Sequence, residues 1–171
     1  MRKRISVVLV AVILGMLACR SLSPPASAYE NKDFSVRIPE GWAWGAGESK
    51  SPYGLAFKLI VNTSHPAVLP RAAFTVSTAP LTGATSLEQL FNQTYEGYSM
   101  PAVSKQKYSQ DGLSGYEITY THNLGEGLLR YRDIWLEKGA TAYVLSFSCP
   151  ANSDEYTNTF DQILASFQFK D

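Results

Sequence analysis

Apolar residues recur at every second position along six segments of this 171-residue chain, and this alternation constrains the fold most. Successive side chains of a β-strand point to opposite faces of a sheet, so each segment predicts a strand with a buried face. Connections of hairpin length favour antiparallel neighbours over parallel strands joined by crossover helices. The predicted strands are 34–38, 55–61, 72–78, 116–120, 129–138 and 143–149.

Two further segments repeat apolar residues at spacings of three and four, which is typical of amphipathic helices. The first follows Thr85-Ser86-Leu87-Glu88, which has the form of a capping box, and we expect it to end near Gly97. The second follows Pro150, with Asn152 or Ser153 as its expected cap. Its apolar stripe consists of Tyr156, Phe160, Ile163, Leu164 and Phe167.

The last predicted strand indicates how helices and sheet are arranged. One of its faces carries only the small residues Ala142, Val144, Ser146 and Ser148. A face open to water would carry charged and bulky side chains, whereas small residues allow a helix to lie close. The sequence therefore predicts an α+β fold in which an antiparallel sheet of about six strands is sandwiched between helices.

The first residues have the pattern of an export signal. Arg2, Lys3 and Arg4 precede an apolar run from Ile5 to Ala18, which is too short to span a bilayer comfortably. Two cleavage sites remain open. Met16-Leu17-Ala18-Cys19 resembles a lipobox, although lipoboxes usually carry Leu at the position of Met16, and Ala26-Ser27-Ala28 fits ordinary signal peptidase.

Each cleavage site implies a different location. Cleavage before Cys19 predicts a signal peptide at 1–18, a lipid on Cys19, a tether at 19–30 and a domain at 31–171. Such a protein would be anchored at the outer face of the cell membrane, in the periplasm or in a thylakoid lumen. Cleavage after residue 28 would instead release a secreted protein.

Charge argues against nucleic acid as a partner. The chain has 15 basic and 15 acidic residues. Loss of the signal before Cys19 leaves 12 basic residues and a net charge of −3, and cleavage after residue 28 also removes Arg20 and gives −4. Nucleic-acid binding requires clustered Lys and Arg, which this acidic domain lacks.

Residues with catalytic or metal-binding chemistry are scattered along the sequence. His65 and His122 lie far from each other and outside any cluster of ligands, and Cys149 ends an apolar strand as a small buried residue would. Asp133 and Glu137 are about 13 Å apart along a strand, so we expect solvated charges or salt bridges with neighbouring Arg and Lys. We therefore predict no catalytic residues, no metal site and no cofactor.

Trp42 and Trp44 are the candidate partner surface. They share one face if this stretch is extended, and tryptophan is enriched at the energetic centres of protein interfaces. Core packing is the alternative role for each. We predict that the Gly- and Ser-rich residues 45–53 form an adaptable loop beside them.

Three passages together resemble PsbP-like domains. They are Phe34-Ser35-Val36-Arg37-Ile38-Pro39-Glu40-Gly41-Trp42, Arg132-Asp133-Ile134-Trp135 with Gly139 and the strand 143–148, and the tail from Tyr156 to Phe167. The resemblance spans about residues 29–171. It implies a Mog1/PsbP-type fold, shared by extrinsic proteins of photosystem II and by many bacterial lipoproteins, and a family without a shared catalytic centre.

The residues and the resemblance lead to one functional hypothesis. We expect an exported, membrane-anchored, non-enzymatic module that binds or helps to assemble a protein partner near the membrane. The alternatives are an accessory protein of photosystem II at the lumenal face and a secreted enzyme. The basic N-terminal extension of the plant photosystem proteins has no counterpart here, which argues against a direct role in oxygen evolution.

Overall fold

The computed structural model describes residues 26–50, 55–63, 72–82, 85–96, 102–123 and 127–171. A large sheet in this part of the chain contains β3 (Trp42–Lys50), β4 (Ala56–Thr63), β5 (Ala73–Pro80), β6 (Ala102–Gln110), β7 (Leu113–Asn123), β8 (Leu128–Lys138) and β9 (Thr141–Pro150). A small sheet contains β1 (Ser27–Glu30), β2 (Phe34–Ile38) and β10 (Gln168–Phe169). The two described helices are α2 (Leu87–Glu96) and α3 (Thr157–Ser166).

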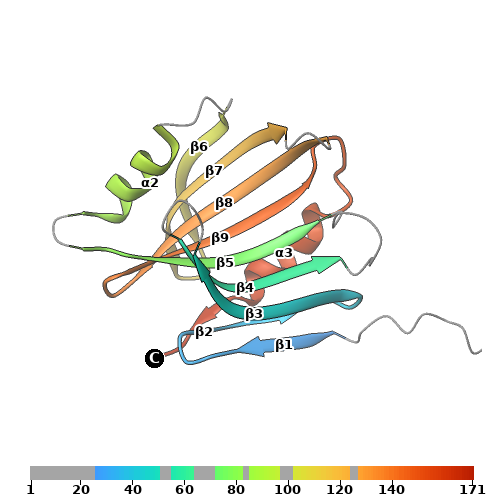
Figure 1. Ribbon diagram of the computed structural model, residues 1–171, viewed down its shortest axis with the longest axis horizontal. Helices are drawn as coiled ribbons and strands as arrows, with labels where there is room; N and C mark the ends of the chain where they lie inside the picture. The colour runs from blue at the N-terminus through green and yellow to red at the C-terminus, as the bar shows by residue number, and fades with distance from the viewer. Residues whose placement is uncertain (1–25, 51–54, 64–71, 83–84, 97–101, 124–126) are drawn as a thin grey trace, which may run out of the picture.

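All neighbours in the large sheet are antiparallel, in the order β3-β4-β5-β9-β8-β7-β6 (Figure 1). In the small sheet, β2 lies between β1 and β10. Five of the six predicted strands therefore belong to the large sheet, and the segment 34–38 is a strand of the small sheet instead. The large sheet has seven strands because it also contains the two edge strands β3 and β6, which were not among the predicted strands.

Each face of the large sheet carries a separate apolar cluster. The first cluster joins Phe160, Ile163 and Leu164 of α3 to the face formed by residues such as Phe74 and Phe147. The second cluster joins α2 to the opposite face and consists of Leu87, Phe91, Ile118, Trp135, Ala142 and Val144. Ala142 and Val144 confirm that the small-residue face of β9 packs with a helix.

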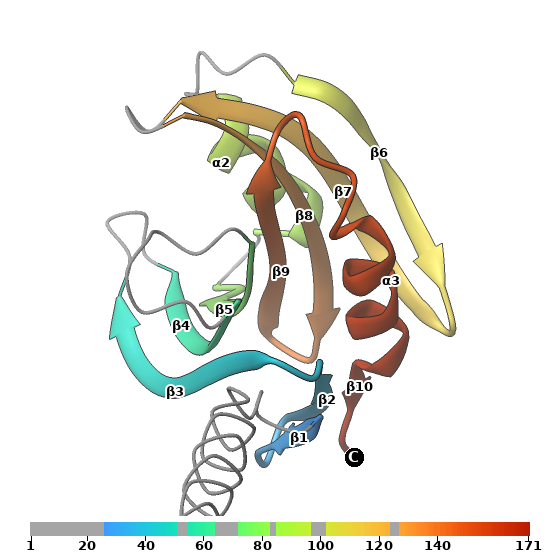
Figure 2. The same cartoon turned by 90° about the vertical axis from the view of Figure 1, so that its right-hand side faces the viewer.

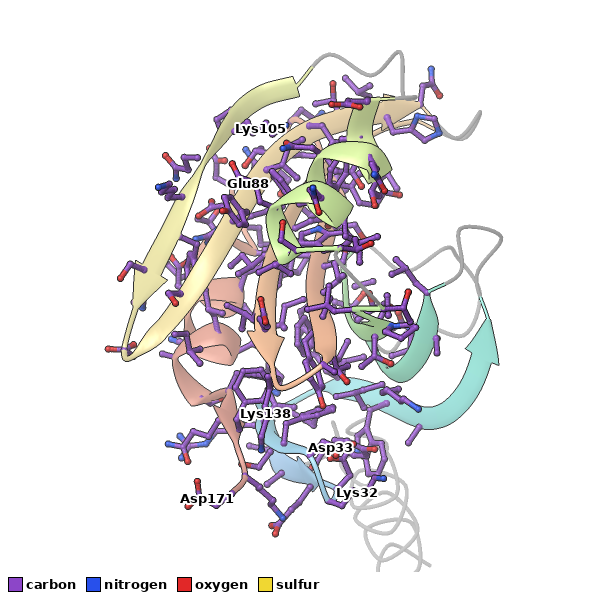
Figure 3. All side chains as sticks on the ribbon, turned by 90° about the vertical axis from the view of Figure 1, so that its left-hand side faces the viewer. Lys32, Asp33, Glu88, Lys105, Lys138 and Asp171 are labelled. Carbon is purple, nitrogen blue, oxygen red and sulfur yellow. The ribbon has the colours of Figure 1, made fainter. Side chains whose placement is uncertain are left out.

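The two helices lie on opposite sides of the sheet, and each covers part of it (Figure 2). The contacts of α2 with the sheet involve β7 and β8. Lys105 of β6 reaches α2, where its Nζ donates to Oδ1 of Asn92 and lies 4.9 Å from the centroid of the Phe91 ring (Figure 3). The predicted sandwich is thus confirmed in part, as an antiparallel sheet with one helix packed against a portion of each face.

Helix starts differ from the predicted caps in both cases. The capping box of α2 is formed by Ser86 and Gln89, one residue later than predicted, with each side chain accepting the other's backbone N–H at 3.2 and 3.0 Å. Tyr156 caps α3 without a side-chain hydrogen bond, so neither Asn152 nor Ser153 has the predicted role. Burial of the apolar stripe, which the sequence did predict, holds α3 in place.

The loop predicted beside the tryptophans also differs. Residues 45–50 belong to strand β3 rather than to a loop, while 51–53 lie outside the described residues. The hairpin between β6 and β7 turns at Asp111-Gly112. Both residues have positive φ, 52° and 80°, as a two-residue hairpin turn of type I′ requires, and glycine adopts that conformation without strain.

Candidate functional site

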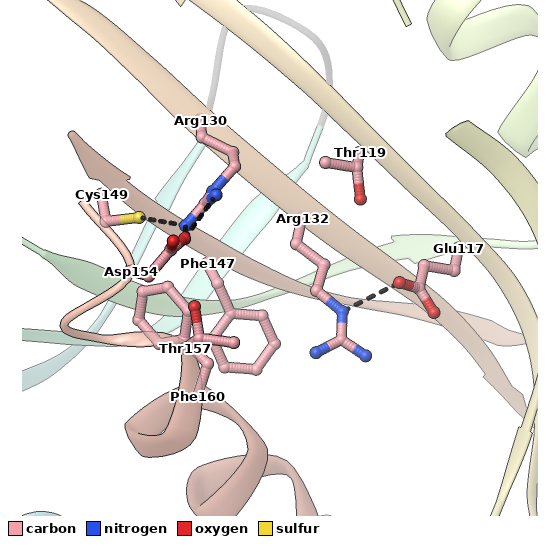
Figure 4. Close-up of a pocket in the computed structure, with 9 residues that line it drawn as sticks. All are labelled: Glu117, Thr119, Arg130, Arg132, Phe147, Cys149, Asp154, Thr157 and Phe160. Carbon is pink, nitrogen blue, oxygen red and sulfur yellow. Dashed lines mark hydrogen bonds and ion pairs between the residues drawn. The ribbon is translucent and has the colours of Figure 1, made fainter. Parts of the chain in front are cut away.

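A pocket of about 300 Å³ opens on the face of the sheet that carries α3. Side chains from β7, β8 and β9 form its wall, and α3 with the residues before it forms the opposite side (Figure 4). Its lining combines two arginines and two carboxylates with two phenyl rings. The lining residues are Glu117, Thr119, Arg130, Arg132, Phe147, Cys149, Asp154, Thr157 and Phe160.

Alternation along β8 places both arginines in this pocket. Arg130 and Arg132 occupy the same face as the core residues Ile134 and Leu136, because residues two apart in a strand point the same way. The apolar core therefore ends where the arginines begin. Sequence reasoning missed the pocket, although two arginines on the face that becomes apolar further along the strand are a visible signal.

Arg130 is anchored to the segment that precedes α3. Its Nη2 donates to the backbone carbonyl of Ser153 at 2.8 Å, and both Nη1 and Nη2 donate to one carboxylate oxygen of Asp154 at 3.0 Å. The Asp154 side chain is 89% exposed. This ion pair is therefore in contact with solvent at the mouth of the pocket.

Arg132 has two carboxylate partners. Its Nε donates to Glu117 at 2.9 Å and its Nη1 donates to Asp161 of α3 at 2.8 Å. Burial lowers the pKa of Arg132, but the hydrogen bonds to Asp161 and Glu117 outweigh burial and leave the pKa above its usual value. Arg132 thus remains charged and connects β7 and β8 to α3.

Cys149 is buried, as the sequence predicted, at 2% exposure. Its Sγ lies 3.9 Å from both Nη2 of Arg130 and the carbonyl oxygen of Ser153. A reactive cysteine needs an accessible thiolate and a nearby base. This sulfur is buried, and its described neighbours, Arg130 and the Ser153 carbonyl, do not include a base. Both observations fit a packing role.

On the opposite face, Asp133 is buried rather than solvated, which makes the sequence-based prediction for this residue wrong. Tyr95 of α2 and Tyr120 of β7 donate to its Oδ2 at 2.6 and 3.0 Å, and Ser146 of β9 donates to its Oδ1. Trp135 Nε1 donates to the Tyr95 hydroxyl at 3.0 Å. Burial raises the pKa of Asp133, and the three hydroxyl donors lower it only in part.

Because the pKa of Asp133 is raised, we expect the stability difference between the wild type and Asp133→Asn to depend on pH. A carboxyl whose pKa is raised in the folded state stabilises the fold below its unfolded pKa of about 3.9, and this contribution is lost as pH rises through the folded pKa. The free energy of unfolding of the wild type should therefore fall relative to that of Asp133→Asn as pH rises from about 4 towards neutral pH. Urea unfolding of both proteins across that range measures the difference. Parallel curves would contradict the raised pKa.

The two candidate tryptophans have different surroundings. Trp42 is 7% exposed and packs edge-on against Tyr156 and Phe160 in the first cluster. Trp44 is 46% exposed and makes an edge contact with Tyr29, with ring centroids 5.3 Å apart. Of the predicted partner surface, Trp44 is thus the part that solvent and a partner can reach.

The other candidate residues that the structure describes do not come together. His122 lies near the end of β7 opposite Leu129, Glu137 is exposed on β8, and His65 and Cys19 lie outside the described residues. In the part of the chain that the structure describes, no three His, Cys, Asp or Glu residues are grouped to hold a metal ion. No described helix is both long and apolar enough to cross a membrane.

Solved structures with a similar fold come from a cyanobacterium, a mycobacterium and a yeast. PsbP from the cyanobacterium Synechocystis sp. PCC 6803 (CyanoP) is 14% identical, with a TM-score of 0.59 over 89% of this chain and 95% of that one. LpqN of Mycobacterium tuberculosis is 13% identical, with a TM-score of 0.56 over 86% of each chain. The Saccharomyces cerevisiae protein Mog1p is 10% identical, with a TM-score of 0.51 over 85% of this chain and 96% of that one. At these identities the likeness concerns the fold alone.

Sequence comparison identifies the family. No curated protein matches the chain. The profile of the family described as PsbP-like protein matches residues 22–169, which include every described strand and both described helices. The chain therefore belongs to the PsbP-like protein family.

Proposed function

We propose that this chain is an exported, membrane-anchored PsbP-like protein that binds a protein partner and catalyses no reaction. Export and anchoring rest on the basic and apolar N-terminal residues and on the lipobox-like Met16-Leu17-Ala18-Cys19. Binding rests on the surface at β3. The lack of catalysis rests on the pocket, where the described carboxylates and arginines pair with one another rather than with a nucleophile.

The exposed Trp44 on an edge strand is the observation that carries the binding proposal. β3 is the last strand of the large sheet, so one side of its backbone pairs with β4 and the other side is an edge. Residues 43–47, Ala-Trp-Gly-Ala-Gly, are all exposed. An extended segment of a partner could add to this edge and place an apolar side chain against Trp44.

The opposite edge of the sheet is less suited to such pairing. β6 carries Lys105 and Lys107, both exposed, whereas residues 43–47 of β3 carry no charge. Lysines on edge strands oppose the addition of another strand. The surface around Trp44, which we call the β3 edge, is therefore the proposed partner surface.

Two of the similar structures support particular partners. Mog1p is a Ran-binding protein, which supports the use of this fold for binding another protein. CyanoP is a cyanobacterial PsbP, and this favours an accessory role at photosystem II as the second candidate function. That candidate requires a photosynthetic organism with this chain in the thylakoid lumen.

One experiment separates anchoring from binding. The wild type, Cys19→Ser and Trp44→Ser are expressed in the native organism, membranes are isolated, and proteins that co-purify with each version are quantified. Cys19→Ser should lose membrane retention and lipid-dependent processing. Trp44→Ser should stay on the membrane but lose the partner, because the tryptophan contributes to the interface and not to the anchor.

The outcomes are distinguishable. Unchanged retention and processing of Cys19→Ser would refute the lipid anchor. Unchanged co-purification with Trp44→Ser would refute the β3 edge as the partner surface. Leu128→Ser, at an exposed apolar residue of β8, is the matched control and should behave as the wild type.

A further inference from the structure

The pocket on the α3 face contains an arginine whose carboxylate partner is exposed. Arg130 is held in position without Asp154, because its Nη2 also donates to the backbone carbonyl of Ser153 at 2.8 Å. Asp154 adds an ion pair in which its own side chain is 89% exposed. Exposed pairs of this kind contribute about 0–1 kcal/mol, so another carboxylate can replace Asp154 at little cost.

We propose that this pocket binds a small carboxylate that bears an apolar group, with the ligand carboxylate taking the place of Asp154 on Arg130. A guanidinium presents parallel N–H groups that match the two oxygens of a carboxylate. Asp154 uses one oxygen for both N–H groups. A ligand carboxylate can instead form a bidentate pair with the same fork.

The apolar part of the ligand has a defined place. The rings of Phe147 and Phe160 line the pocket beside the arginines, with centroids 4.8 Å apart (Figure 4). A volume of about 300 Å³ lies at the lower limit of small-molecule pockets. The ligand is therefore small, with an aromatic or branched group that contacts these rings while its carboxylate faces Arg130.

The charges of the lining favour a singly charged ligand over a phosphate. Arg132 has two carboxylate partners, the exposed Asp161 and the largely buried Glu117. Exchange of Asp161 would therefore leave Arg132 paired with Glu117, whereas the carboxylate partner of Arg130, Asp154, is 89% exposed. A dianion would face one exchangeable guanidinium together with the negative charge of Glu117, which disfavours it.

This inference is independent of partner binding at the β3 edge, because Trp44 does not line the pocket. It is tested by calorimetric titration of the purified full-length protein with 3-phenylpropanoate. The uncharged 3-phenylpropanamide and acetate are the comparison ligands. The acid should bind at least about tenfold more tightly than the amide, because the amide cannot pair with Arg130, and acetate should bind more weakly because it lacks the ring.

Two substitutions should change affinity for 3-phenylpropanoate in opposite directions. Asp154→Asn removes the competing carboxylate and should tighten binding about threefold or more, whereas Arg130→Gln should weaken it at least about tenfold. Arg37→Gln, at an exposed arginine of β2, and Asp171→Asn are the matched controls and should leave affinity unchanged.

Several results would overturn the proposal. They are equal affinity for acid and amide, no binding of the acid by either the wild type or Asp154→Asn, and a loss of affinity in Asp154→Asn. Circular dichroism and the thermal midpoint check folding of each variant. If Arg130→Gln fails to fold, the acid–amide pair and Asp154→Asn decide the question, because Asp154 is exposed and its substitution should leave the fold intact.

Discussion

Phe160→Ala is expected to lower the free energy of unfolding by about 3–5 kcal/mol. Phe160 is 6% exposed, and its ring lies 4.8 Å from that of Phe147 and 6.5 Å from that of Trp42. It thereby joins α3 to both β9 and β3. Its truncation removes buried apolar area and leaves a cavity between the helix and the sheet. Urea unfolding followed by tryptophan fluorescence measures the loss.

The control for this substitution lies on the same helix. Gln162 is exposed, so Gln162→Ala should change the free energy of unfolding by no more than about 0.5 kcal/mol. A thermal midpoint that is unchanged by Phe160→Ala would show that α3 does not belong to the core. The first apolar cluster would then need a different explanation.

Gly115→Ala is expected to cost about 3 kcal/mol or more, because the backbone of β8 occupies the space of a side chain there. A Cβ at Gly115 would lie 1.8 Å from the carbonyl oxygen of Trp135 and 3.0 Å from its carbonyl carbon. Both are backbone atoms of the neighbouring strand, so no rotamer change relieves the clash. The β7–β8 pair must separate locally, and both apolar clusters depend on those strands.

Gly47→Ala on β3 is the matched control. A Cβ at Gly47 would meet nothing within 4 Å, so this variant should unfold within about 0.5 kcal/mol of the wild type. Equal stability of Gly115→Ala and Gly47→Ala in urea unfolding would contradict the close approach of β7 and β8.

Period-two and helical patterns were enough to predict the strands around Phe74 and Phe147 and the buried stripe of α3, because each pattern reports burial along one element. The edge strands β3 and β6 were missed because their residues 43–47 and 104–107 are exposed on both faces, so no buried face imposes an alternation of apolar and polar residues. The bulge in β4, between Phe57 and Leu59, shows the same limit. It interrupts the alternation, so Leu55 packs with the second cluster and Leu59 with the first.

The environment of Asp133 could not be predicted from its neighbours in sequence. Its three hydroxyl donors come from α2, β7 and β9, and Tyr95 is 38 residues away. Within β8 alone, Asp133 appears as one of several charged residues beside Arg130 and Arg132. Only the packing of α2 on the sheet brings the donors together and excludes water.

The pocket, too, is formed by residues that lie far apart in the sequence. Arg130 and Asp154 are 24 residues apart, and their contact depends on the turn that returns the chain from β9 to α3. The sequence could indicate that Arg130 and Arg132 share a face with the core. It could not show which carboxylate each arginine meets, because the partners Glu117, Asp154 and Asp161 lie in separate parts of the chain.

Site-specific crosslinking in the native organism tests partner binding at the β3 edge most directly. A photoreactive amino acid replaces Ala46, exposed beside Trp44 on β3, in one version and Lys107, exposed on the opposite edge strand β6, in the other, so that Trp44 is retained. Irradiation should yield a discrete crosslinked protein from position 46 and none from position 107. The same product from both positions, or no product from position 46, would contradict the proposed function.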